Sequence, residues 1–175
     1  MTLKQAQLDR LSGLSREQLL DFIDMQQKNW WNLQNNWMLY VNTEYGEEAA
    51  VKGDSHCFPR TAKVQMYRLI KFLGLKDDLG SLMDAMVLST IWANGDYEIW
   101  QVDDTRFRIK VVHCYQQVRR LEDGLSELPC KPAGIAICEA AAQVINPNAR
   151  VRCLVCPPDE HPEDVWCDWE FEIPK

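Results

Sequence analysis

The sequence predicts an α+β protein of 175 residues, with a helical N-terminal half over residues 1–94 and an α+β region over residues 95–175. Through the first half, apolar residues recur every three or four positions, which is the spacing of one helix face. From about residue 97, segments alternate between apolar and polar residues, as half-buried strands do. A chain of this length suits one domain with a real core, so we expect the two regions to form one compact domain.

The first long helix begins at Ser15–Gln18, which has the residue pattern of a capping box, and Gly46 interrupts it. It carries an apolar stripe at helical spacing, which we expect to face the core. The stripe consists of Leu19, Ile23, Trp30, Leu33, Trp37, Tyr40 and Val41. Trp30 and Trp37 lie one heptad apart, and their alternative role is to line a ligand cavity.

Three further helical segments complete the N-terminal half. One covers Glu47 to about Ser55, and Phe58-Pro59 is expected to break it, because the residue before a proline is pushed out of helical geometry. Helix is expected again from Arg60 to Leu73, and then from Leu79 to Trp92.

The second region begins with a predicted β-hairpin, formed by strands 97–102 and 106–112 around a polar turn. In the second strand, three apolar residues share one face and three basic residues share the other. The apolar set is Phe107, Ile109 and Val111, and the basic set is Arg106, Arg108 and Lys110. One face of the sheet is therefore expected to be buried and the other to be solvated or covered by polar contacts.

Two helices and a strand pair follow the hairpin. A short helix is predicted over residues 115–122, and a longer one from Pro129-Cys130-Lys131-Pro132 to Ile145. Strands 150–155 and 165–173 are expected to pair with each other across an acidic, proline-rich loop.

Composition excludes several classes of function. The net charge of −7 and the absence of a clustered basic face argue against nucleic-acid binding. No segment approaches the roughly 18 apolar residues of a membrane span, and the first residues are polar, so we expect no membrane insertion, no export signal and a cytoplasmic location. The odd count of 7 cysteines favours reduced thiols over a disulfide framework.

The clearest chemical signal is a set of cysteines in the second region: Cys130, Cys153, Cys156 and Cys167. If the last two strands pair, Cys153 and Cys156 lie at the end of one strand and Cys167 near the start of the next. Cys130, in the first turn of the preceding helix, can reach the same end of the sheet. Four thiolates complete the tetrahedral coordination of zinc, and such a site links secondary-structure elements that have few core contacts with one another. We therefore expect a structural zinc.

Several alternatives to this zinc site stay open. The cysteines can be buried apolar residues, or ligands of an iron–sulfur cluster. His161, in the loop between Cys156 and Cys167, can replace one cysteine. Three basic residues beside the site are expected to offset the charge of a four-thiolate zinc: Lys131, Arg150 and Arg152. Cys138 lies among alanines and is expected to pack in the core.

The same residues carry a family resemblance. The order Cys130, Ala133-Gly134, Cys153/Cys156, then Cys167 and Phe171 resembles the C-terminal half of the 4-vinyl reductase domain. The resemblance implies an antiparallel sheet with flanking helices, and a zinc held in that family by three Cys and one Glu. Cys153 stands where the Glu is expected, which implies an all-cysteine site here, while Trp169 occupies the place of the usual Phe.

Two further similarities concern the same strands. Cys167-Asp168-Trp169-Glu170-Phe171 is similar to the last strand of thiazoline-carboxylate hydrolase-like proteins. A group of uncharacterised cytosolic proteins is similar in its Cys after the second hairpin strand, its Pro-Cys-Lys helix start, its Cys-x-x-Cys and its late Trp-Cys. That group implies no activity.

Candidate reactive groups are few. Cys114 is a candidate nucleophile, but the adjacent His113 points to the opposite face of a strand, which leaves His56 as the other candidate base. The alternative is that Cys114 is buried or lines a pocket. Asp54-Ser55-His56-Cys57 has the letters of a catalytic triad, or of a second metal site, within one short segment.

These observations predict a zinc-stapled protein that binds a small apolar or aromatic molecule between the helices and the sheet. Trp30, Trp37 and Cys114 are the expected ligand contacts. One alternative is a hydrolase of small cyclic C–N or C–S compounds that uses Cys114. Another is a protein-interaction or assembly module, which a broad exposed apolar patch on the N-terminal helices would favour. A homodimer is an expected assembly.

Overall fold

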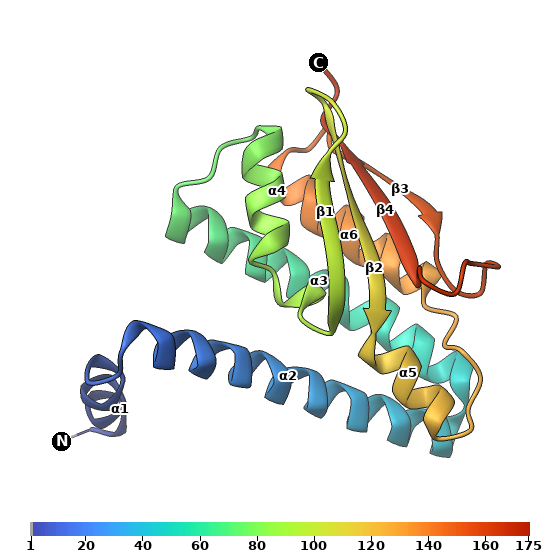
Figure 1. The fold of residues 1–175 in the computed structure, drawn as a ribbon, viewed down its shortest axis with the longest axis horizontal. Helices are drawn as coiled ribbons and strands as arrows, with labels where there is room; N and C mark the ends of the chain where they lie inside the picture. The colour runs from blue at the N-terminus through green and yellow to red at the C-terminus, as the bar shows by residue number, and fades with distance from the viewer. Residues whose placement is uncertain (1) are drawn as a thin grey trace.

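A computed structural model describes residues 2–175 and has the α+β architecture that the sequence predicts (Figure 1). Its elements in chain order are α1 (Leu3–Ser12), α2 (Arg16–Tyr45), α3 (Glu47–Leu73), α4 (Leu79–Val87), the 3-10 turn η1 (Thr90–Trp92), β1 (Gly95–Gln101), β2 (Arg106–Cys114), α5 (Tyr115–Glu122), α6 (Lys131–Ile145), β3 (Arg150–Val155) and β4 (Cys167–Glu172). No helix in this part of the chain is long and apolar enough to cross a membrane.

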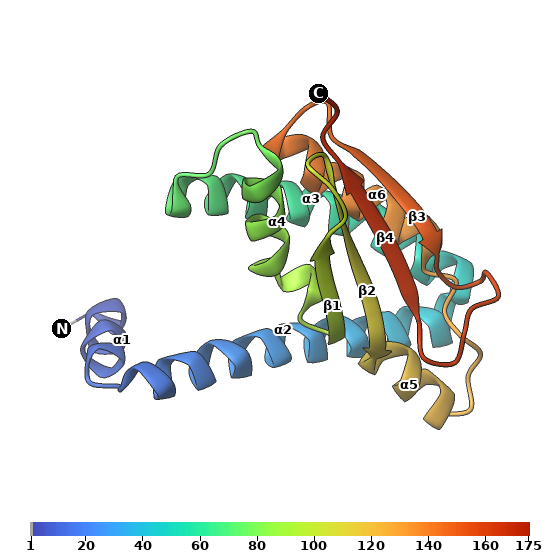
Figure 2. The same cartoon turned by 45° about the horizontal axis from the view of Figure 1, so that its top comes forward.

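The four strands form one antiparallel sheet in the order β1-β2-β4-β3. The predicted pairing of the last two strands is confirmed, and β4 also pairs with β2 at the centre of the sheet. Figures 1 and 2 show α6 lying across one face of this sheet, with α3 on the far side of α6. The helices therefore form layers on a single face.

The core lies between the sheet and these helices. Phe107 and Phe171, on neighbouring strands, are fully buried and their rings stack at 4.9 Å. They share one apolar cluster with Met66 of α3 and Leu82 of α4. The predicted inward face of the second strand is confirmed, because Ile109 is also fully buried there.

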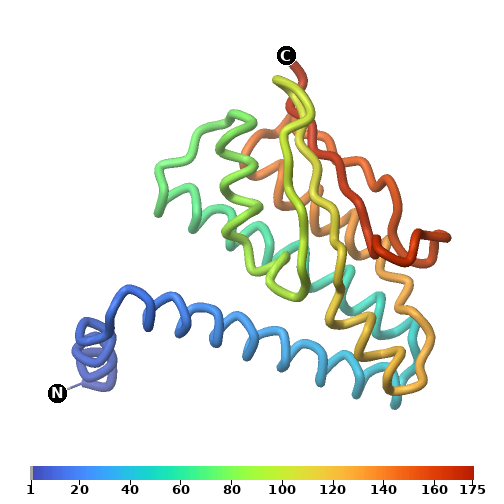
Figure 3. The backbone as a smooth tube through the Cα atoms, viewed as in Figure 1, coloured from blue at the N-terminus to red at the C-terminus, as the bar shows by residue number. Residues whose placement is uncertain are grey.

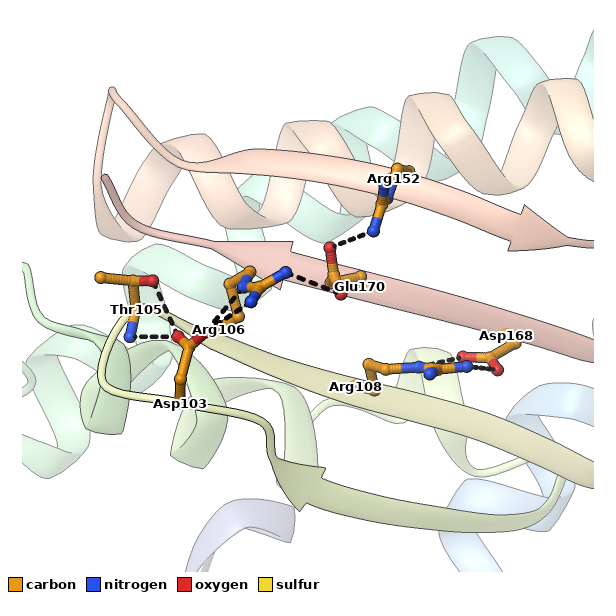
Figure 4. A network of polar contacts seen from close by, with 7 residues as sticks. All are labelled: Asp103, Thr105, Arg106, Arg108, Arg152, Asp168 and Glu170. Carbon is orange, nitrogen blue, oxygen red and sulfur yellow. Dashed lines mark hydrogen bonds and ion pairs between the residues drawn. The ribbon is translucent and has the colours of Figure 1, made fainter. Parts of the chain in front are cut away.

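The outer face of the sheet carries rows of opposite charge. β2 contributes Arg106, Arg108 and Lys110, β4 contributes Asp168, Glu170 and Glu172, and β3 contributes Arg150 and Arg152. Figure 4 shows Arg108 donating two hydrogen bonds to Asp168, while Arg106 and Arg152 both reach Glu170. Asp168 and Glu170 are buried beneath these arginines. The expectation of a polar outer face is thus confirmed.

Helix α2 departs from the sequence prediction. Its buried residues are Trp31 and Met38, one position on from Trp30 and Trp37. Most of the predicted core-facing stripe is solvent-exposed: Leu33 is 70% exposed and Trp37 is 55% exposed. The tube in Figure 3 shows why, since α2 contacts the body near its C-terminal end and leads away from it toward α1. The prediction that this stripe packs into the core is wrong.

Helix α3 is continuous through Pro59, so the predicted break at Phe58-Pro59 is also wrong. Phe58 is buried and packs against the Trp31 ring at 5.9 Å, and Ala62 is buried one turn later. These contacts on both sides of the proline offset its lost hydrogen bond. The helix expected over residues 79–92 instead ends at Val87 and is followed by η1.

Candidate metal centre and ligand cavity

The candidate metal ligands come from three adjoining elements. Cys130 precedes α6 as its N-cap residue, Cys153 lies on β3, Cys156 follows that strand, and Cys167 is the first residue of β4. The Lys131 amide N–H donates to the Pro157 carbonyl at 2.9 Å, which ties the start of α6 to the Cys-x-x-Cys turn. The antiparallel pairing of β3 with β4 holds the remaining cysteine at the same end of the sheet.

Cys156 is the central thiol of this group, because Cys130 lies within hydrogen-bonding distance of it and Cys153 and Cys167 are close enough to raise its pKa as well. The sulfur atoms of Cys130 and Cys156 are 3.7 Å apart. Ligands about 2.3 Å from a tetrahedral zinc are about 3.8 Å from one another. Within residues 2–175, however, no group of three or more His, Cys, Asp or Glu side chains is arranged so that it could hold an ion as it stands.

The pKa values of these thiols are unequal. The hydrogen bond from Cys156 lowers the pKa of Cys130, against the effect of burial, and Gln117 adds a second donor at 3.4 Å. Cys156 likewise lowers the pKa of Cys153, and the charge of Lys131 acts in the same direction. The contacts with the other thiols raise the pKa of Cys156 itself. Two thiols at the site are therefore biased toward the thiolate form that a metal requires.

The basic residues expected to offset the site's charge behave differently from one another. Lys131 lies close enough to lower the pKa of Cys153, and its ammonium group also pairs with Asp159 at 2.6 Å. Arg152 instead pairs with Glu170 on the outer face of the sheet. Lys131 is thus the cation of the predicted set that acts on the thiols.

His161, the alternative metal ligand, has both ring nitrogens engaged elsewhere. Nε2 lies 3.2 Å from the Glu127 carboxylate and Nδ1 lies 3.0 Å from the Pro162 carbonyl oxygen. Burial acts to lower the pKa of His161, but these two hydrogen bonds raise it above its ordinary value. Because a metal binds the neutral ring, this environment favours the all-cysteine set.

The structure gives little support to Cys114 as a nucleophile. Burial raises the pKa of Cys114 to about 12, and the nearby Cys167 adds to this effect. His113 packs edge-to-face on the Tyr115 ring at 4.8 Å, and His56 lies exposed on α3 beside the exposed Cys57. Cys114 is therefore a thiol, not a thiolate, near neutral pH.

An apolar cavity of about 130 Å³ lies beside the cysteines, between α2, α3, α6 and the sheet. Three of the four candidate ligands line it: Cys130, Cys156 and Cys167. Three indole rings line it as well, from Trp31, Trp92 and Trp169. The metal centre and the cavity thus share a wall.

The cavity uses other residues than the sequence predicts. Trp31 lines it, and its indole N–H donates to the Thr90 carbonyl at 2.8 Å. Trp30 lines a separate groove between α2 and α3, and the Trp37 ring lies over Gly53. Trp31 and Met38 are also one heptad apart, so this spacing was a signal for the buried face of α2. Asp54, which the sequence analysis considered only as part of a triad-like or metal-binding segment, is a carboxylate on the cavity wall.

Comparison with known proteins gives one positive result. No curated protein and no solved structure matches the chain. The model of DUF6125, a family of unknown function, matches residues 12–173, which is most of the chain. The protein therefore belongs to the DUF6125 family.

Proposed function

We propose that this protein is a zinc-stapled receptor for a small apolar or aromatic molecule. The observation that carries the proposal is the cavity of about 130 Å³ whose wall combines three indoles with three of the four clustered thiols. Apolar cavities of about 150 Å³ hold a benzene-sized molecule. The cavity size, its lining and its place between the helices and the sheet support the binding of a single-ring ligand.

Zinc is the metal that this donor set favours. Four thiolates satisfy tetrahedral zinc completely, and the 3.7 Å separation of the Cys130 and Cys156 sulfurs fits one edge of such a site. Small side-chain rotations bring the other thiols into place as they lose their protons to the metal. Such a site leaves no open coordination position, so its role is to hold α6 against β3 and β4.

Metal analysis of the purified protein tests the zinc centre. We expect about one zinc per chain, and we expect Cys156→Ser to lose the metal and to lower the melting temperature. Cys57→Ser is the matched control, because Cys57 is exposed on α3 and belongs to no thiol cluster. A protein that purifies without metal and melts at the same temperature with and without a chelator contradicts the zinc proposal.

Binding of toluene tests the cavity, with tryptophan fluorescence as the readout because three indoles line it. We expect saturable quenching that Ala133→Leu abolishes, since Ala133 lines the cavity and a larger side chain fills it. Ala136→Leu, on the same helix but outside the lining, is expected to keep binding. Equal binding by both variants contradicts this location of the site.

A protein-interaction module is the second candidate function, favoured by exposed apolar side chains on α2. Leu20, Ile23 and Tyr40 are each more than half exposed. Ile23 also borders a groove of about 750 Å³, whose other wall, on α3, contains Val64 and Arg68. Several exposed apolar side chains beside one groove are typical of a protein-interaction site.

The charges beside this groove fit a second copy of the chain. The exposed acids Glu17 and Asp21 lie on α2, where Asp24 is already paired with Lys28 at 2.7 Å, while α3 carries Arg60, Lys63, Arg68 and Lys71 after Pro59. In a two-fold dimer, α2 of one copy can meet α3 of the other. We expect wild-type protein to sediment as a dimer and Ile23→Asp as a monomer, with Leu121→Asp on α5 as the control. Wild-type protein that sediments as a monomer at about 100 µM, a concentration far above the Kd of a stable dimer, contradicts the proposed dimer.

A further inference from the structure

Two polar side chains line the cavity, Gln116 of α5 and Asp54 of α3, and Asp54 forms its acidic, polar end. Its two carboxylate oxygens accept from the same donor, the side-chain amide of Gln34, at 3.1 and 3.3 Å. A carboxylate has about four lone-pair sites, so this donor leaves most of its capacity unused. The carbonyl oxygen of Gln34 is itself buried without a hydrogen-bond partner among the described residues. The polar end therefore has a surplus of acceptors.

Among residues 2–175, the cavity wall supplies no cation to balance this carboxylate. The lining residues, all within residues 2–175, include no Lys, Arg or His. Their other ionisable groups are thiols, and a zinc held by four thiolates adds two further formal negative charges beside the cavity. The electrostatic potential inside the cavity thus favours a positive charge.

The apolar part of the wall favours the same charge. Trp31, Trp92 and Trp169 present indole rings, and the faces of these rings attract cations, Trp most strongly of the aromatic side chains. A carboxylate combined with several indoles is an arrangement that recognises an organic ammonium ion. A neutral hydrocarbon offers the Asp54 oxygens no partner beyond Gln34, and an anion is repelled.

We propose that the ligand is a compact aromatic or apolar cation that bears a single protonated nitrogen, and that Asp54 binds this nitrogen. This inference rests on the proposed ligand-binding function and specifies its chemical class. The cavity of about 130 Å³ limits the ligand to roughly one ring with a short substituent. Asp54 sets the specificity, while the indoles supply the apolar contact.

Two probes of similar shape test this class on the full-length, zinc-loaded protein at pH 7.5. Benzylamine carries the cation, and ethylbenzene is its neutral counterpart. We expect benzylamine to bind at least about tenfold more tightly, as measured by tryptophan quenching and by calorimetry. Asp54→Asn keeps the shape of the side chain and is expected to abolish this preference. Glu48→Gln removes an exposed carboxylate from the same helix and is expected to retain it.

The outcomes separate this inference from the proposed function. If both probes bind equally to wild-type protein, the cavity binds apolar ligands but the cation inference is overturned. The same holds if Asp54→Asn keeps the preference. If neither probe binds, the ligand-binding function itself is overturned. The comparison of the two probes on wild-type protein decides the question even if the Asp54 variant fails to fold.

Discussion

At the scale of single residues, Cys156 concentrates the chemistry of the candidate metal centre. It is only 1% exposed, its sulfur lies 3.7 Å from that of Cys130, and Cys153 and Cys167 are close enough to raise its pKa. Without a metal, sulfur atoms packed this closely cannot all ionise, because neighbouring thiolates repel one another. One thiol therefore holds its proton firmly while Cys130 and Cys153 are biased toward ionisation. A divalent cation removes this conflict.

Alkylation by iodoacetamide distinguishes the roles of the cysteines. At pH 7.5 we expect Cys57, which is exposed, to label first, and Cys114, whose pKa is about 12, to label as slowly as the buried Cys138. The zinc-bound thiols are expected to be protected until a chelator is added. Mass spectrometry of the native protein reads each site. Rapid labelling of Cys114 below neutral pH contradicts this expectation and favours the hydrolase alternative.

The stability of the protein is expected to depend on pH through Asp54. Burial raises the pKa of Asp54 from 3.8 to about 6, although the hydrogen bond from Gln34 opposes the shift. Between these values the folded chain holds a proton that the unfolded chain has released. The higher pKa of Asp54 in the folded state therefore stabilises that state in acid. This contribution to the free energy of unfolding is complete below pH 4, is lost as the pH rises through 6, and amounts to at most about 3 kcal/mol.

Urea unfolding at several pH values, with Asp54→Asn beside wild type, measures this contribution. The difference in unfolding free energy between the two proteins is expected to change between pH 4 and 6 and to level off above. If the proposed zinc is bound, its loss in acid affects both proteins and cancels in the difference. The Glu48→Gln variant is expected to show no such change, and a flat difference for Asp54→Asn contradicts the assignment.

At the scale of elements, α6 depends on small residues where it meets the sheet. A Cβ atom added at Gly134 lies 2.7 Å from the Trp169 ring, which is buried in the core. We expect Gly134→Ala to displace this ring and to lower stability by about 1–3 kcal/mol, since overpacked cores lose energy of this size. Gly53→Ala, in the middle of α3, meets only an ordinary contact at 3.8 Å and is expected to stabilise by about 0.5–1 kcal/mol. Thermal melts of both variants test this prediction. A Gly134→Ala variant with the melting temperature of wild type would contradict it.

The elements also show how far the sequence predicts the fold. Period-two alternation located the strands closely, because the core-facing apolar residues recur at every second position of each strand and this pattern is local. The orientation of α2 was missed by one residue, since Trp30 and Trp31 both fit a helical stripe and both contact Phe58 on α3. Trp31 is the buried one, and its indole N–H donates to the Thr90 carbonyl, a contact between distant parts of the chain that the local pattern does not contain. Pro59 was likewise judged from local geometry, whereas packing on both sides of it keeps α3 intact.

The candidate site divides in the same way. Cysteine spacing on consecutive elements was enough to predict that Cys130 and Cys156 lie side by side, with their sulfur atoms 3.7 Å apart, whereas a ligand set of four thiols stays a prediction. The cavity was not predictable in detail, because Trp31, Asp54 and Trp169 come from α2, α3 and β4, whose relative placement is a tertiary property. A carboxylate such as Asp54 also looks like an ordinary helix-surface residue until the neighbouring helix covers it.

At the scale of the whole molecule, the helical half and the α+β half share one core. Met66 of α3 and Leu82 of α4 belong to the same buried cluster as Phe107 and Phe171 of the sheet. We therefore expect residues 95–175 alone to give no cooperative melt, because α6 loses the α3 surface that covers it. Deletion of residues 1–14 is the control: α1 has no buried residue, and the melting temperature is expected to hold. Circular dichroism of both truncations is the measurement, and an independently folding 95–175 fragment is the contrary outcome.

The wall common to the thiol cluster and the cavity has a thermodynamic consequence. Cys130, Cys156 and Cys167 face both, so an occupant of the cavity changes the surroundings of the sulfur atoms, and a metal on the sulfur atoms fixes one side of the cavity. Two ligands that act on the same groups alter each other's affinity by the same factor, in both directions. If zinc and ligand both bind as proposed, metal availability sets ligand affinity, and ligand supply sets metal retention.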